Sequence, residues 1–137
     1  MTAMQPTEPN LAFAELASDE RIARTAASLG PRGITAEVVE NGAAASARVL
    51  ELLPLGAEVF TSLSETLAET GLAAEINESG RYDAIRPKLA RLDRPTQRRE
   101  MKKLAAAPDF VVGSVAATGV QRDADITGEL GHLTLPP

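Results

Sequence analysis

Hydroxyl side chains gather in one short stretch of this sequence, AEVFTSLSETLAETG, at residues 57–71. Ser62, Ser64 and Thr66 alternate there, directly after a short apolar run. Ser62 is followed three residues later by Glu65, and this spacing predicts a capping box at a helix start. The N–H groups of a helix start also attract phosphate and carboxylate. Two interpretations therefore stay open, a cap alone and a cap that also binds an anion.

A second polar pair, Gly113 and Ser114, follows the apolar residues DFVV. If residues 57–61 and 109–114 form parallel strands, the two polar groups lie at the same sheet edge, where open α/β sheets bind ligands. A tight turn at the strand end is the simpler explanation for the glycine and serine. The candidate anion-binding residues are Ser62, Ser64, Thr66, Gly113 and Ser114.

Alternating strands and helices are needed to position these groups. The apolar patterns predict helices within residues 11–29, 43–53, 65–70, 82–92 and 95–108, and strands over 33–39, 57–61 and 109–114. Such alternation predicts a three-layer α/β domain with a parallel sheet. We place this domain at residues 11–118, between a loose N-terminal segment, 1–10, and a C-terminal tail, 119–137.

Local signals refine three of the predicted helices. Ser18 is expected to cap the first one, and Arg48 and Glu51 to pair on the exposed side of the second. Pro87 is expected to kink the fourth helix or to begin it anew. The buried face of the second helix is predicted to consist of Ala43, Ala47, Leu50 and Leu53.

Composition excludes several kinds of chemistry. The 137-residue chain has no cysteine, so it cannot by itself hold a disulfide, a thiolate nucleophile or an iron-sulfur cluster. Its one histidine, His132, is expected to be a solvated tail residue, and neither a Ser-His-Asp triad nor a histidine-rich metal site is predicted. The sequence does not place two carboxylates at a spacing that indicates general acid-base catalysis. No catalytic residue and no metal ligand is therefore assigned.

Charge and hydropathy set expectations about partners and location. The net charge of −5 opposes binding to nucleic-acid backbones. No apolar run approaches the roughly 20 residues that span a bilayer, and the start, MTAMQPTEPN, lacks the pattern of a secretory signal. We therefore expect a cytoplasmic protein that binds neither nucleic acid nor membranes.

The basic side chains are concentrated in one segment. Residues 81–103 hold nine of the 14 basic side chains against three acidic ones, whereas residues 1–80 hold 4 basic and 12 acidic side chains. A solvated helix face is the simpler interpretation. Docking of an acidic partner is the alternative, and its candidate residues are Arg94, Arg98, Arg99, Lys102 and Lys103.

Five stretches, in their order and spacing, resemble the lactate-utilisation (LUD) domain family over about residues 20–118. They are RGITAEVVEN, LPLGAEVF, SLSETLAETGL, GRYDAIRPKL and DFVVGSVAA. The resemblance implies a fold similar to the CoA-transferase and ribose-phosphate isomerase group. It also implies a bacterial role beside iron-sulfur oxidoreductase subunits that oxidise L-lactate to pyruvate, with the clusters held only by those partners.

The resemblance predicts an accessory or substrate-binding subunit with a small carboxylate or phosphate ligand. A stand-alone enzyme acting on a phosphate- or acyl-carrying small molecule through the same crevice is the alternative. The tail, GVQRDADITGELGHLTLPP, departs from the family pattern. The sheet is therefore expected to be incomplete, because the chain is either a shortened natural variant or the product of a lost reading frame. Such a chain would be an inactive family member, or its exposed sheet edge would favour homo-oligomers.

Overall fold

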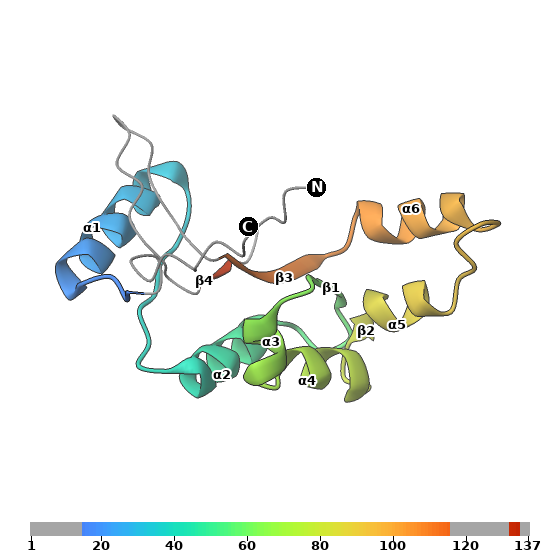
Figure 1. Cartoon of the computed structure of the whole chain (residues 1–137), viewed down its shortest axis with the longest axis horizontal. Coiled ribbons are helices and arrows are strands. Elements are labelled where there is room, and N and C mark those ends of the chain that lie inside the picture. Colours follow the sequence, from blue (N-terminus) through green and yellow to red (C-terminus); the bar gives the residue numbers. More distant parts are fainter. Residues whose placement is uncertain (1–14, 116–131, 135–137) are drawn as a thin grey trace, which may run out of the picture. The chain divides into compact units, whose positions relative to one another are not determined.

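The computed structural model describes residues 15–115 and the backbone of residues 132–134, which divide into two compact units. The described part of the first unit, residues 15–36, holds helix α1 (Asp19–Leu29) and the 3-10 turn η2 (Gly30–Arg32) (Figure 1). Ser18 caps α1 as predicted, because its hydroxyl accepts a hydrogen bond from the Arg21 N–H at 3.4 Å. Acidic residues in the first turn add a favourable interaction with the helix dipole.

The second unit, residues 37–115 with 132–134, is built on a small sheet with the strand order β2-β1-β3-β4. The strands are β1 (Glu58–Thr61), β2 (Asp83–Ala84), β3 (Phe110–Val115) and β4 (His132–Thr134). β1 lies parallel to both β2 and β3, whereas β4 runs antiparallel along the outer edge of β3. The predicted α/β class with parallel strands is confirmed.

Five helices accompany the sheet. They are α2 (Gly42–Leu52), α3 (Glu65–Glu69), α4 (Leu72–Glu78), α5 (Ile85–Ala90) and α6 (Arg98–Ala106). The left-handed backbone of Gly71, with φ at 74°, separates α3 from α4. Pro87 lies in the first turn of α5, where an amide proton would have no helical partner, so it begins the helix without breaking it.

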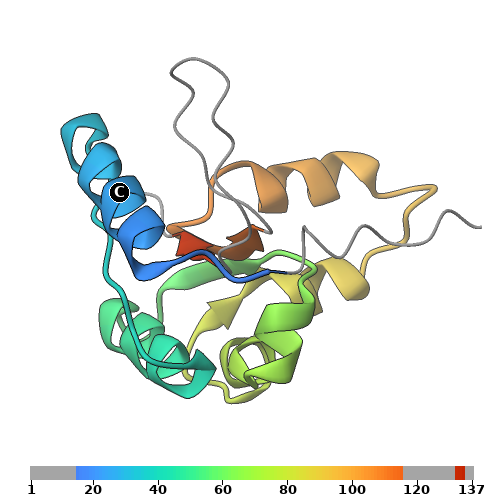
Figure 2. The ribbon, with the colours of Figure 1, turned by 60° about the vertical axis from the view of Figure 1, so that its left-hand side comes forward.

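The core of this unit lies between the sheet and the helices α2, α3 and α4, which cover one face (Figures 1 and 2). Branched aliphatic side chains fill it, at roughly 1.5–3 kcal/mol for each fully buried one. They are Val49, Leu53, Val59, Leu67, Leu72, Ile76 and Val112. In both views α6 lies on the other side of the strands from α3 and α4, and none of its side chains is fully buried.

The predicted strand over residues 33–39 is wrong. Residues 34–39 have no regular structure, and Val38 is 68% exposed. The physical reason is that both edges of β1 are already paired, with β3 on one side and the short β2 on the other. Sequence patterns missed β2 because its two residues, Asp83 and Ala84, are too few to show a period.

The predicted buried face of α2 is only partly correct. Leu53 is buried and Leu50 half-buried, but Ala43 and Ala47 are exposed. Ser46 and Val49 take the inner positions instead. The true inner face is therefore rotated toward Val49, because a larger apolar group gains more from burial than alanine does.

Candidate functional site

The carboxyl ends of β1, β2 and β3 point to the same edge of the sheet, because these three strands are parallel. After Thr61, the last residue of β1, the chain stays attached to β3 through a hydrogen bond of 2.8 Å from the Ser62 N–H to the Val112 carbonyl. The predicted polar residues after β1 are thus held beside β3. This edge is the candidate site.

Ser64 and Ser114 meet across the edge. Ser64 ends the loop after β1 and caps α3, accepting a hydrogen bond from the Leu67 N–H at 3.2 Å. Its hydroxyl is also hydrogen-bonded to the hydroxyl of Ser114 in β3. Since one hydroxyl of the pair donates and the other accepts, one O–H remains, and it can be donated to an anion. The structure therefore brings together two of the predicted anion-binding residues.

Ser62 does not have its predicted role. The capping box is wrong, because the hydroxyl that caps α3 belongs to Ser64. The Ser62 hydroxyl oxygen is buried and has no hydrogen-bond partner among the described residues. The predicted capping box requires a helix that begins directly after Ser62. The loop after β1 is two residues longer than that, so the helix begins at Glu65. A buried oxygen cannot contact a ligand while this arrangement holds.

Gly113 lies beside Ser62. It is not in a turn at the strand end, as the simpler sequence interpretation held, because β3 continues through it to Val115. A Cβ atom at this position would lie 2.8 Å from the Ser62 Oγ and 3.4 Å from its Cβ. Glycine is required here because the loop after β1 approaches β3 closely.

Thr66 lies in α3 and takes no part in the hydroxyl pair. Its backbone carbonyl accepts hydrogen bonds from the Thr70 hydroxyl at 2.8 Å and from the Thr70 N–H at 3.1 Å. A different threonine, Thr61, is buried at the end of β1, where its hydroxyl accepts from the Asn77 side-chain amide at 3.0 Å. This bond ties β1 to α4 and holds the edge in place.

Arg86 is the basic residue at this edge that the sequence interpretation did not single out. It is the second residue of α5, which follows β2, and its Nε donates to the Thr61 carbonyl at 2.8 Å. Its guanidinium carbon lies 4.9 Å from the centroid of the Phe60 ring, a cation-π contact. Both contacts fix the half-buried side chain beside the end of β1. The one feature of the sequence that could have indicated Arg86 is its position directly after the apolar residues Ala84 and Ile85.

The predicted basic segment forms the exposed surface of α6 and of the turn before it. Arg94, Arg98, Arg99, Lys102 and Lys103 are all exposed. Two adjoining hollows of about 310 and 440 Å³ lie on this surface; their lining residues are Arg94, Pro95, Arg98, Met101 and Lys102. The half-buried Met101 and Leu104 form the inner side of the helix, whereas Ala105 is exposed.

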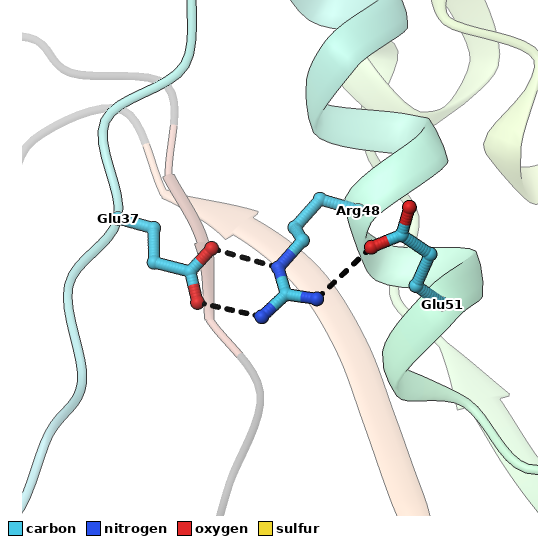
Figure 3. Close-up of polar contacts among 3 residues, drawn as sticks. All are labelled: Glu37, Arg48 and Glu51. Carbon is cyan, nitrogen blue, oxygen red and sulfur yellow. Dashed lines mark hydrogen bonds and ion pairs between the residues drawn. The ribbon is translucent and has the colours of Figure 1, made fainter.

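One arginine-centred ion network lies elsewhere in the second unit (Figure 3). Arg48 in α2 donates to both carboxylate oxygens of Glu37, at 2.7 and 2.9 Å, and to Glu51 at 3.0 Å. The predicted pair of Arg48 and Glu51 is confirmed. The hydrogen bonds from Arg48 lower the pKa of Glu37 and raise the pKa of Arg48 itself. These contacts attach the segment before α2 to the helix, so we assign them a structural role.

Several expectations concern residues outside the described part. The side chain of His132 is among them, although its backbone lies in β4. Within residues 15–115, no three histidine or acidic side chains are close enough together to hold a metal ion. Across the described segments, no helix is both long and apolar enough to cross a bilayer.

Comparisons with known proteins do not identify the family of this chain. No protein-family model matches it, and no curated protein or solved structure matches it either. The fold and the site together define a mixed α/β protein with polar groups and one arginine at the carboxyl edge of three parallel strands.

Proposed function

We propose that this protein binds a small carboxylate, with phosphate as the related alternative, at the carboxyl edge of its parallel strands. The observation that carries the proposal is the arrangement of Arg86 and the pair of Ser64 and Ser114 at that edge. The Arg86 Nε is occupied by the Thr61 carbonyl. Its two terminal nitrogens have no hydrogen-bond partner among the described residues, and together they match a carboxylate in a bidentate pair.

The serine pair adds a second kind of recognition. Its remaining O–H can donate to an anion, and its oxygen lone pairs can accept from a hydroxyl on the ligand. A 2-hydroxy acid such as lactate carries both groups on adjacent carbons. The proposed ligand class is therefore a short hydroxy acid, or the corresponding keto acid, rather than a simple fatty acid.

The resemblance of five sequence stretches to the lactate-utilisation family supports a more specific role. In this role the chain is an accessory or substrate-binding subunit of bacterial L-lactate oxidation, with a fold similar to the CoA-transferase and ribose-phosphate isomerase group. Its partners would be iron-sulfur oxidoreductase subunits, which would hold all the clusters. The parallel strands and the ligand edge agree with that fold group at the level of class.

A stand-alone enzyme for a phosphate- or acyl-carrying small molecule is the second candidate. It is favoured by the serine pair, because hydroxyl and N–H groups at a strand end also bind phosphate. Co-purification of the chain with iron-sulfur proteins would favour the accessory subunit. Turnover of a phosphate- or acyl-carrying substrate by the isolated chain would favour the enzyme.

Binding is tested by calorimetric titration with L-lactate, pyruvate, acetate and phosphate. The Arg86→Gln variant is expected to bind L-lactate at least about tenfold more weakly, because loss of a charge-assisted hydrogen bond costs roughly 1.5–3 kcal/mol. The matched control is Arg91→Gln, which removes the same charge from the exposed C-cap residue that follows α5. Equal affinities in both variants would contradict the site, and L-lactate binding no tighter than acetate would contradict the role of the serine pair.

A further inference from the structure

We propose that the basic surface of α6 is a self-association surface that binds the acidic helices α3 and α4 of a second copy of this chain. The basic surface is defined by Arg94, Arg98, Arg99, Lys102 and Lys103. The acidic surface is defined by Glu65, Glu69 and Glu78. This proposal concerns a surface separate from the carboxylate site, and it holds whether or not the chain binds lactate.

The basic surface is distinguished by how few of its charges are used within the fold. Three of the four other basic residues between positions 81 and 103 have partners, and Arg91 forms no ion pair with a described carboxylate. Arg81 pairs with Glu75 at 3.0 Å, and Lys88 pairs with Asp83 at 2.6 Å. Arg86 is held by a carbonyl and an aromatic ring. In contrast, none of the five side chains of the basic surface forms an ion pair with a described carboxylate.

Several charges of α6 lie in unfavourable positions, although Glu100 in its first turn and Lys103 in its last turn complement the helix dipole. Arg98 and Lys102 are four residues apart, as are Arg99 and Lys103, so like charges lie next to each other along the helix. Arg98 and Arg99 also lie in the first turn, where a positive charge opposes the helix dipole. Carboxylates from another molecule, placed against these residues, would relieve both unfavourable interactions.

The same chain carries a surface of the opposite sign. Glu65 and Glu69 lie four residues apart on α3, Glu78 ends α4, and all three side chains are exposed. None of the three lies in an ion pair with a described basic residue. Two surfaces of opposite charge are therefore present on one chain, and this complementarity identifies a second copy as the partner.

Geometry determines the kind of assembly. In both views the strands lie between α6 and the helices α3 and α4, so one molecule cannot pair its own two surfaces (Figures 1 and 2). Because the two surfaces lie on opposite sides of the strands, two molecules cannot make both contacts at once, and the contact is heterologous. It produces head-to-tail chains or rings rather than a two-fold dimer. The average mass should therefore increase continuously with protein concentration.

Sedimentation analysis of the full chain tests this proposal at two ionic strengths. Near 10 mM salt, where the screening length is roughly 30 Å, we expect concentration-dependent oligomers. Near 1 M salt, where that length is roughly 3 Å, we expect monomers. The double variants Arg98→Glu with Lys102→Glu and Glu69→Lys with Glu78→Lys are each expected to reduce the association constant by roughly tenfold or more.

Mixing the two variants provides the decisive measurement. The first variant keeps its acidic surface and the second keeps its basic surface, so an equimolar mixture should show association that neither variant shows alone. The control is Arg24→Glu with Arg32→Glu, which makes the same change of net charge as the first variant on exposed residues of the first unit and should associate like the wild type. Circular dichroism establishes that each variant is folded.

Three results would overturn the proposal. The wild type could be monomeric at both salt concentrations, or the reversals could associate like the control. The mixture could also fail to restore association although both variants are folded. A monomer that instead binds single-stranded DNA through the same five side chains would assign the surface to nucleic acid.

Discussion

A methyl group at position 113 is the most direct test of the packing between β3 and the loop after β1. In a Gly113→Ala variant the new Cβ would lie 2.8 Å from the Ser62 Oγ and 3.4 Å from the Ser62 Cβ. The first distance is well inside van der Waals contact, and the second is at its lower limit. The Ser62 oxygen is buried, so it has little room to rotate away from the added carbon.

The expected loss of stability is that of an overpacked interior, about 1–3 kcal/mol. Most of this loss arises from the hydroxyl oxygen, since only that atom falls below 3 Å. A Ser62→Ala substitution removes this oxygen and with it a buried polar group that lacks a partner among the described residues. Ser62→Ala alone should therefore be neutral or slightly stabilising.

The two substitutions should be coupled, and a double-mutant cycle measures this coupling. Urea unfolding of the four proteins, followed by circular dichroism, gives the free energies of unfolding. The cost of Gly113→Ala should fall by roughly 0.5–3 kcal/mol when residue 62 is alanine. Gly30→Ala is the control, because its Cβ would meet no atom within 4 Å. An unchanged stability of Gly113→Ala, or the same cost in both backgrounds, would show that the Ser62 hydroxyl does not limit the space at position 113.

Two further predictions concern the loop after β1 and the segment before α2. Ser64→Ala should lower the free energy of unfolding by about 1 kcal/mol, since it removes the cap of α3 and the partner of Ser114; a denaturation midpoint equal to that of Ser62→Ala would be the contrary result. The pKa of Glu37 is lowered below its ordinary value of 4.5 by Arg48, so the contact stabilises the fold above that pH and is lost as the pH falls through the lower pKa. NMR order parameters of residues 34–40 should therefore fall in acid, and Arg48→Gln should remove this pH dependence; equal profiles in both proteins would show that the network does not hold the segment.

Local signals in the sequence were sufficient for α1, α2, α3, α5 and α6 and for the two longer parallel strands, but they predicted no helix where α4 lies. Ser18 before two acidic residues marked the start of α1, and the apolar runs marked β1 and β3. The pairing of Arg48 with Glu51 followed from helical spacing alone. Each of these features depends on residues within one or two turns of each other, so the chain specifies them without reference to its distant parts.

The sequence also indicated that hydroxyl groups follow the strand ends. It did not indicate which of them caps the helix and which is buried. Ser64 and Ser62 are two residues apart and chemically identical, and a capping box could be written for Ser62 on spacing alone. The structure gives the cap to Ser64 and buries Ser62 against Gly113. The choice depends on the bond from Ser62 to Val112, which fixes where the loop leaves the sheet and cannot be inferred from local spacing.

The segments that pair beside β1, and the basic group that reaches the site, depend on long-range contacts that no local pattern encodes. Residues 33–39 have the composition of a strand, yet two residues near position 83 take the place beside β1. That choice carries α5 to the end of β1 and places Arg86 against Thr61 and Phe60. A short strand gains its stability from its neighbours rather than from its own residues, because ladder hydrogen bonds and burial exist only once the partner strand is in place.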